Sequence, residues 1–378
     1  MSGMLIAARL TASRRPELGS DCWGGRSAGS GPQPPRLGTH ATGMGNMTDL
    51  DQAAALPAED ATGQPELDQV SPGDGVHYLK LAGLLSNAKL GAEDRRKLEE
   101  ESIPRYRQWK ADLEGATGVG DAKVAELVRI LNEYKTYIEL DLIWDSTDSF
   151  LYRQKGQLKI DNSIIEEFLP YLIDVDILPD LASLPSDSFE VGPRSAFSSA
   201  YFAAALTDPS SAGLRVRAKD QDFALGRPAY LMASLDVSFP ASQSEKIRIF
   251  QAFVAAECKT NLDKTMFQEA NATAHDLKMA IAGSKYYLLC EWLDMTPLST
   301  AGTDIDEVII LRGKRPASNV RKNWADASVR QADRTRFQDF LQENPIRVDS
   351  INRLVKHIEA VVSHTDELEE DVLVRGYF

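Results

Sequence analysis

The chain has 378 residues, a formal net charge of −14 and 43% apolar residues, which is enough apolar material for one large or two ordinary globular domains. No apolar run approaches the ~18–20 residues of a membrane span, so integral membrane proteins are excluded. Three cysteines without paired spacing exclude a disulfide framework and indicate a reducing compartment, the cytoplasm. The acidic balance argues against a protein that coats nucleic acid non-specifically.

The first 74 residues differ from the rest in composition. They hold 11 of the 25 glycines and 7 of the 18 prolines, without a period. Such a composition predicts a disordered leader over residues 1–74, and Met44 or Met47 is an alternative start of translation.

Residues 75–206 are predicted to form a helical region that contains one β-hairpin. Apolar residues at helical spacing predict helices from Val76, over 121–142 and from Ser163. The strand-like segments 150–153 and 157–160 flank Lys155-Gly156, which predicts a hairpin. A short helix is predicted over 196–206.

Residues 207–313 change to a pattern of strands. Strands are expected over 214–225, 230–239 and 248–260, with a break at Gly226-Arg227-Pro228 between the first two. A helix over 263–282 and strands over 285–293 and 307–311 follow. This order predicts an α/β fold, a mixed β-sheet flanked by helices. Residues 314–378 are predicted to be a basic helical region, since Arg312 to Lys356 contains eleven Lys or Arg against five Asp or Glu.

The predicted strand 248–260 ends in a pattern that carries chemistry. Glu257 and Lys259 are two residues apart, so both side chains project from the same face, while Cys258 points to the apolar side. A carboxylate and an ammonium held side by side at the end of a buried strand must be paired, hydrated or bound to a metal. They form half of a site for phosphodiester hydrolysis, in which the carboxylate holds a divalent cation and the lysine assists the attacking water.

A second carboxylate is needed to complete the oxygen shell of the metal, and Asp220, Asp222 and Asp236 are the candidates. With a turn near Gln243, Glu257 is expected opposite Tyr230, and Asp236 then lies too far along the strand. If the break at Gly226 folds the earlier strand back, Asp222 comes level with Glu257. Asp222 is therefore the preferred second ligand and Asp220 the alternative.

The Glu-x-Lys triplet is weak evidence by itself. It recurs at Glu133-Tyr134-Lys135, on a predicted helix, where we expect it at the surface. An ordinary ion pair at the end of a strand is the competing interpretation of Glu257 and Lys259.

The longer sequence context resembles a known group of enzymes. Asp222 followed by Glu257-Cys258-Lys259 and a helix resembles the PD-(D/E)xK nuclease superfamily, although no proline precedes Asp222. The strings ECKTNLDKTMFQEA (257–270), QDFALG (221–226) and FLYRQKGQLKIDNSIIEEFLP (150–170) are similar to type II restriction endonucleases of the BbvCI-like kind, which cut at CTNAG-containing sites. The resemblance covers roughly residues 150–313.

The resemblance implies a site-specific DNA endonuclease that uses Mg²⁺. It assigns metal binding to Asp222 and Glu257, with the Cys258 carbonyl as a further ligand, and assigns the catalytic lysine to Lys259. The implied reaction hydrolyses a phosphodiester of double-stranded DNA and leaves a 5′-phosphate and a 3′-hydroxyl. A repair or recombination nuclease of the same superfamily and a non-catalytic DNA-binding protein are the alternatives.

Other residues have candidate roles in binding DNA. Lys264 and Gln268, one turn apart near the start of the helix after Lys259, could contact the scissile phosphate. The basic segment predicts backbone contacts from Arg312, Lys314, Arg315, Arg321 and Lys322, with Arg330, Arg334 and Arg336 as further candidates. Glu166 and Glu167 could supply an extra helix glutamate, but surface acids are the preferred interpretation. Cutting both strands requires a homodimer or a second endonuclease subunit.

Overall fold

The computed structural model describes residues 75–185, 188–207 and 211–363, without the side chain of Lys314. All of these residues belong to one compact unit. The leader predicted over residues 1–74, Cys22 and the acidic tail from residue 364 lie outside the described residues. Among the described helices, none combines the length and the apolar character of a membrane-spanning segment.

The N-terminal region is helical, as the spacing of its apolar residues predicts. It contains α1 (Val76–Leu85), α2 (Ala92–Lys97), α3 (Ile103–Glu114), α4 (Asp121–Thr136), α5 (Phe150–Leu158) and α6 (Ser163–Phe168). A π-helical segment, Leu98–Ser102, joins α2 to α3, and another, Tyr137–Trp144, extends α4. Short 3₁₀ turns follow at Leu169–Leu172 and Pro179–Ser183. The helices expected from Val76, over 121–142 and from Ser163 are confirmed.

A five-stranded sheet follows, in the order β1-β2-β3-β4-β5. Its strands are β1 (Glu190–Phe202), β2 (Leu214–Ser234), β3 (Ser244–Leu262), β4 (Lys285–Leu293) and β5 (Glu307–Lys314). The pairs β1–β2 and β2–β3 are antiparallel, whereas β3–β4 and β4–β5 are parallel. The helix α7 (Lys264–Ala280) connects β3 to β4, and α8 (Ser318–Asn323), α9 (Ala327–Ala332), α10 (Arg334–Glu343) and α11 (Val348–Val362) follow β5. The predicted α/β class with a mixed sheet is confirmed.

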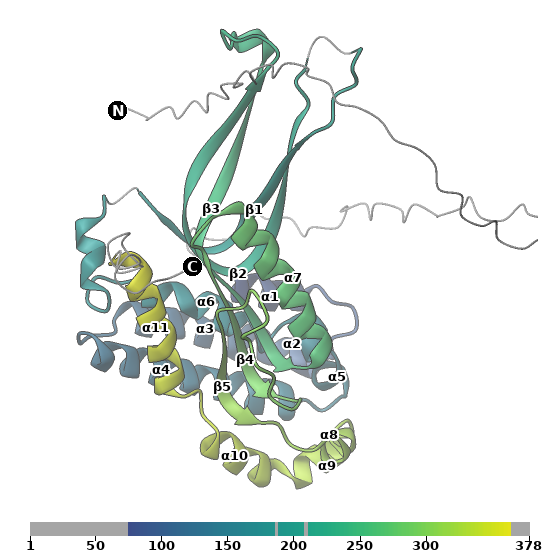
Figure 1. The fold of residues 1–378 in the computed structure, drawn as a ribbon. Coiled ribbons are helices and arrows are strands. Elements are labelled where there is room, and N and C mark those ends of the chain that lie inside the picture. Colours follow the sequence, from purple (N-terminus) through teal and green to yellow (C-terminus); the bar gives the residue numbers. More distant parts are fainter. Residues whose placement is uncertain (1–74, 186–187, 208–210, 364–378) are drawn as a thin grey trace, which may run out of the picture. The chain divides into compact units, whose positions relative to one another are not determined.

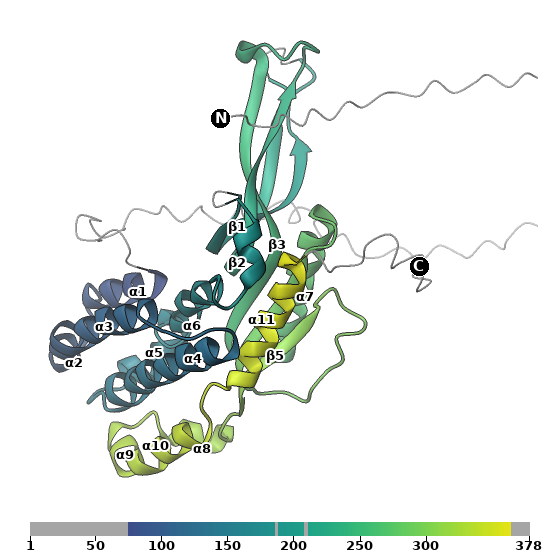
Figure 2. The ribbon, with the colours of Figure 1, turned by 90° about the vertical axis from the view of Figure 1, so that its left-hand side faces the viewer.

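The parallel part of the sheet is covered by helices on both faces. Alternate residues of β4 face opposite sides: Tyr287 and Leu289 pack into the core shared with the N-terminal helices and α11, whereas Tyr286 and Leu288 pack against α7 (Figure 2). Burial on both faces explains why β4 is an almost unbroken apolar run.

The strand β2 folds back on itself. The carboxylate of Glu245 accepts a hydrogen bond from Leu214 N at 2.8 Å, and Glu245 is also the cross-strand partner of Ala233, so the two ends of β2 lie together. The β1–β2 ladder shifts its register between Gly192 and Arg194, and the β2–β3 ladder shifts between Leu225 and Gly226. The resulting pair of hairpins extends beyond the helices that flank the rest of the sheet (Figure 1).

The hairpin predicted over residues 150–160 is wrong, because this segment forms α5. Leu151 and Leu158 are seven residues apart and fall on one helical face, and Leu151 is fully buried. The turn comes later, at Lys159, which has a left-handed backbone (φ 52°). Gly156 is an ordinary helical residue in α5 and does not form a turn.

Two further expectations about the strands are wrong. Residues 196–206 are not a helix: β1 covers 190–202, with Ala196 and Ser198 buried at the spacing of a strand. Residues 214–225 and 230–234 belong to a single strand, β2, which runs through Gly226 and ends at Ser234, so residues 235–239 are not part of a strand. A side chain at Gly226 would place its Cβ 2.1 Å from the carbonyl oxygen of Gln251, so the bulge there requires a glycine.

Candidate active site

Glu257 and Lys259 lie next to each other near the end of β3, with their side chains on one face as the strand period predicts. Lys259 Nζ is 2.5 Å from Glu257 Oε1, and both side chains are about one quarter exposed (24% and 27%). Tyr286, on the adjacent parallel strand β4, donates its hydroxyl to Glu257 Oε2 at 2.9 Å. Both carboxylate oxygens of Glu257 therefore have partners, while the pair still reaches solvent.

Asp222 lies where β2 separates from β3. Pairing between these strands begins at Phe223 with Ala256, and Asp222 precedes it in the chain. Beyond this point the backbone of β2 no longer bonds to β3. The side chain of Asp222 takes over, and its Oδ2 accepts a hydrogen bond from Cys258 N at 2.8 Å.

Asp222 lies beside the end of β3 that carries Glu257, but the pairing of β2 with β3 that places it there is not the predicted one. Tyr230 pairs with Arg248, not with Glu257, so the register assumed for the two central strands is wrong. The turn that joins them is also earlier than expected, since Ser234 pairs with Ser244. The alternative ligand Asp220 is hydrogen-bonded to Ser195 on β1 instead. The remaining candidate, Asp236, bonds within its own turn.

Three residues between the end of α5 and the first turn of α6 complete the surroundings of Asp222. Asn162 donates from Nδ2 both to the Cys258 carbonyl and to Glu166 Oε1, each at 3.0 Å. Lys159 Nζ lies 3.5 Å from Asp222 Oδ1 and 3.5 Å from Glu166 Oε1. The backbone of β3 at Cys258 is thus held by side chains on both of its polar groups, Asp222 on the N–H and Asn162 on the carbonyl.

Glu166 is buried, and so is Glu167, which corrects the interpretation of these two residues as surface acids. Burial, with the charge of Asp222 as the next cause, raises the pKa of Glu166 above its ordinary value. Glu167 accepts hydrogen bonds from His77 N and the Tyr106 hydroxyl, which makes its role structural. Only Glu166 of the two faces Asp222.

The cysteine between the two charged residues of β3 is a packing residue. Cys258 is buried on the apolar side, as predicted, and burial raises its thiol pKa well above the ordinary value. Its backbone contributes to the site and its thiol does not. Cys290 is likewise a buried free thiol.

The donors around Asp222 and Glu257 suit a hard divalent cation. Two carboxylates and the Cys258 carbonyl supply oxygen only, which Mg²⁺ prefers, and Mg²⁺ commonly binds through one or two carboxylates together with water and substrate phosphate. Within the described residues, no three His, Cys, Asp or Glu side chains form a metal-holding group by themselves. The oxygen donors therefore fit a divalent cation that completes its coordination with further ligands.

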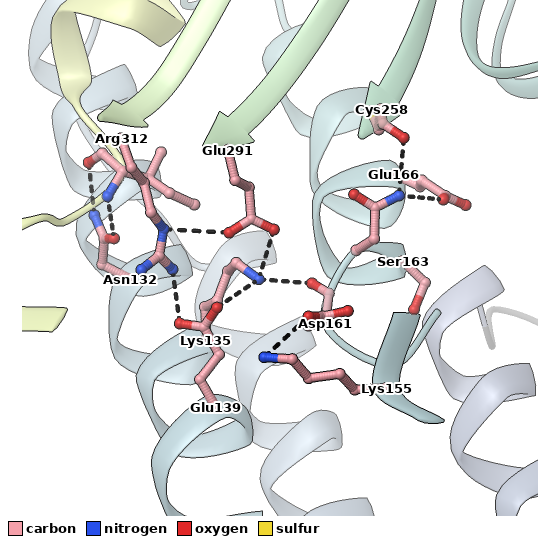
Figure 3. A network of polar contacts seen from close by, with 12 residues as sticks. Asn132, Lys135, Glu139, Lys155, Asp161, Ser163, Glu166, Cys258, Glu291 and Arg312 are labelled. Atoms are coloured by element: carbon pink, nitrogen blue, oxygen red, sulfur yellow. Dashed lines mark hydrogen bonds and ion pairs between the residues drawn. The ribbon is translucent and has the colours of Figure 1, made fainter. Parts of the chain in front are cut away.

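Two arginines that were expected to contact DNA are buried instead. The guanidinium of Arg312 pairs with Glu139 Oε2 at 2.9 Å and with Glu291 Oε2 at 3.2 Å (Figure 3). Arg330 is fully buried and donates to the backbone carbonyls of Trp144, Ser146 and Asp148. The basic composition of the segment did not reveal these partners, because they are distant in the sequence.

Lys135 belongs to the same buried network as Arg312, so its expected surface position is wrong. Its ammonium contacts Glu291 Oε1 at 3.0 Å, Glu139 Oε1 at 3.2 Å and the Asp161 carbonyl at 2.7 Å. Figure 3 shows this cluster between the ends of β4 and β5 and the helices, near Glu166 and Cys258, which are bridged by the amide of Asn162. We call Lys135, Glu139, Glu291 and Arg312 the buried charge cluster.

The remaining predicted DNA contacts are accessible to different degrees. Lys322, Lys264 and Gln268 are exposed. Arg315 bonds to Asn261 Oδ1, and both Arg315 and Arg321 pair with Asp294. Arg334 pairs with Asp141 and Asp145. A surface pocket lined by Arg153 and Lys322 lies elsewhere than the carboxylates of the candidate site.

Sequence reasoning missed Lys159, Asn162 and Tyr286. Tyr286 could have been found, because a strand parallel to β3 must present a side chain beside Glu257. Lys159 and Asn162 could not, since the predicted hairpin displaced the turn that carries them.

An α/β sheet with a carboxylate–lysine pair at a strand end, and an aspartate where the neighbouring strand departs, is consistent with an α/β nuclease fold. The sequence profile of the Bpu10I restriction endonuclease family matches residues 157–378, which is more than half of the chain, and the chain belongs to this family. It is a type II restriction endonuclease, a site-specific deoxyribonuclease, as the resemblance implied.

Two other comparisons complete this result. The solved structure described as the native BbvCI A2B2 tetramer at low resolution contains a chain with 21% sequence identity and a TM-score of 0.48; the match covers 76% of this chain and 96% of that one. No curated protein matches the sequence.

Proposed function

We propose that the chain hydrolyses DNA phosphodiesters at a specific double-stranded sequence with Mg²⁺ as cofactor, and that Asp222, Glu257 and Lys259 carry the reaction. The observation that supports this most is the hydrogen bond from Cys258 N to Asp222 Oδ2, because it ties the distant aspartate to the strand of Glu257 and Lys259. Restriction endonucleases generally use a divalent cation, and the oxygen donors here fit one.

The cation would be held by Asp222, Glu257 and the Cys258 carbonyl. When bound, it supplies a Lewis acid that lowers the pKa of water and stabilises charge on the phosphate. Lys259 places a positive charge beside Glu257, where it can orient the attacking water and offset the charge that develops on the phosphate. Tyr286 fixes the second oxygen of Glu257, so that the carboxylate keeps one orientation.

The contacts to DNA are part of the same proposal. Lys264 and Gln268 are exposed at the start of α7, where the helix N-terminus favours a phosphate. Lys322 is exposed. Arg315 and Arg321 both pair with the half-buried Asp294, and each can exchange this ion pair for one with a DNA phosphate. Lys314 lies at the end of β5, and its side chain is outside the described part.

Cutting both strands requires two active sites, so we further propose that the chain acts as a homodimer or with a second endonuclease subunit, in the cytoplasm. Sedimentation of the protein with and without a cognate duplex would measure the number of subunits.

The test is incubation of the protein with a defined plasmid, with Mg²⁺ and with chelator, followed by mapping of the ends. We expect discrete sequence-specific cuts or nicks with 5′-phosphates that require the cation. Glu257→Gln should abolish cutting and keep DNA binding. Cutting that persists in Glu257→Gln, or random fragmentation, would contradict the proposal.

A further inference from the structure

We propose that Lys159 is a tethered cation that occupies the carboxylate pair Asp222–Glu166 until a divalent cation displaces it. This inference rests on the proposed function, because it assumes that Asp222 binds the metal. It adds a residue that controls the affinity of the site for that metal.

The position of the ammonium is the first observation. Lys159 Nζ is 3.5 Å from one oxygen of each carboxylate, so the two oxygens can be no farther apart than the sum of these distances. Asp222 has one oxygen committed to Cys258 N, and Lys159 is beside the other one, Oδ1. This is the oxygen of Asp222 that remains available to a metal.

The surroundings of the pair favour a cation between the two carboxylates. Glu166 is 96% buried at its side chain and shares its Oε1 between Asn162 and Lys159. Two carboxylates in a partly desolvated site repel each other unless a positive charge separates them. Lys159 supplies that charge from a side chain that is 46% exposed, so it can leave toward solvent without opening the core.

The backbone of Lys159 is the second observation. It ends α5 in the left-handed region, at φ 52° and ψ 29°, a conformation that favours glycine. A lysine at this position costs about 1 kcal/mol relative to an unstrained backbone. Glycine would be the default residue here, whereas the lysine places an ammonium between Asp222 and Glu166.

Lys159 binds the two carboxylates only weakly, because both of its contacts are long and its side chain is half-exposed. Each such ion pair is worth roughly 0.2–1 kcal/mol, far less than the coordination of a divalent cation by carboxylate oxygens. A metal can therefore displace the ammonium, but its apparent affinity is reduced by the competition.

The experiment measures binding of Mg²⁺ and Mn²⁺ alone, without DNA, by isothermal titration calorimetry. Lys159→Met keeps the aliphatic side chain and removes the charge. We expect it to bind either ion about 2- to 30-fold more tightly than the wild type, because two ion pairs of about 0.2–1 kcal/mol each no longer compete with the metal. The matched control is Lys246→Met, which removes the same charge from an exposed lysine that pairs with Met232 in the far part of the β2–β3 hairpin.

Thermal unfolding gives a second measurement that does not depend on activity. Without metal, Lys159→Met leaves Asp222 and Glu166 to repel each other, so its Tm should fall below that of the wild type. Added Mg²⁺ should then raise the Tm of Lys159→Met by more than it raises the Tm of the wild type. In a Glu166→Gln background, the effect of Lys159→Met on the affinity should shrink, because the pair no longer exists.

Unchanged or weaker metal binding by Lys159→Met would overturn the inference. If Lys159→Met does not fold, Lys159→Gly tests the same expectation, since it also removes the charge and relieves the backbone. The proposed function fails separately, if the wild type neither cleaves DNA nor binds Mg²⁺. Suppose that the wild type does both and that Glu257→Gln binds no Mg²⁺. A Lys159→Met variant that does not bind metal more tightly then refutes only the role of Lys159.

Discussion

Replacing Lys135 by Met tests whether the buried charge cluster depends on balanced charges. Lys135 is fully buried, and its ammonium is within 3.2 Å of carboxylates from Glu139 and Glu291. It also donates to the Asp161 carbonyl. Met fills a similar volume, so the change removes mainly the charge and the hydrogen bonds.

The expected destabilisation is large. Removing one partner of a buried ion pair typically costs about 3–5 kcal/mol, because the remaining charge stays desolvated. Glu291 loses one of its two cations and keeps Arg312, whose Nε is 3.2 Å from Glu291 Oε2. We therefore expect Lys135→Met to lower the free energy of unfolding by about 3–4 kcal/mol near pH 8.

The pH dependence distinguishes a charge effect from a packing effect. Burial raises the pKa of Glu291 to about 7. Its carboxyl group therefore stays protonated to a higher pH in the folded protein than in the unfolded chain. The stability linked to this proton is complete below the ordinary pKa of 4.5 and is lost as the pH rises through about 7. Protonated Glu291 needs Lys135 less, so Lys135→Met should be clearly less destabilising at about pH 5.5 than at about pH 8.5.

The measurement is urea-induced unfolding of wild type and variant at both pH values. The control is Lys135→Met combined with Glu291→Leu, which removes a whole pair and should recover part of the lost stability. The same destabilisation at both pH values, or a double variant as unstable as the single one, would show that charge balance does not hold this region together.

Three further predictions concern single residues. Asp222→Asn should stop cleavage with little change in stability, because the amide still accepts from Cys258 N. Asp222→Ala should also cost about 1–3 kcal/mol, and equal stability of the two variants would contradict this. Tyr286→Phe should slow cleavage about 3- to 10-fold at an unchanged circular dichroism spectrum, since Glu257 loses one donor; a full rate would make that hydrogen bond irrelevant. Arg330→Met should lower the stability by more than about 3 kcal/mol through orphaned carbonyls, and a stable variant with weakened DNA binding would restore its expected role.

The order of three strands, one helix and two strands was predicted from the sequence. The number of strands before the helix was right only because two errors compensated each other. The strand β1 was taken for a helix, and β2 was divided at Gly226. The parallel strands were predicted well because burial on both faces makes them continuous apolar runs. The bent antiparallel strands were not, since bulges and pairing over long distances decide where they continue.

The candidate site shows the same limit. A period of two places Glu257 and Lys259 on one face of any strand, so this part needed no tertiary information. Asp222 was favoured over Asp220 and Asp236 through a register that the structure does not have. The residues around α6 depend on a turn at Lys159, where a lysine adopts a backbone conformation that sequence patterns assign to glycine.

The buried charge cluster also restricts how the chain can be divided. Lys135 and Glu139 come from the helical region, whereas Glu291 and Arg312 come from the sheet, and each pairs across the boundary. Either half alone would keep one ion pair, Lys135–Glu139 or Glu291–Arg312, and would lose both pairs that cross the boundary. A truncated protein of residues 207–313 should therefore fail to fold, and the helices and the sheet should unfold together in a single transition.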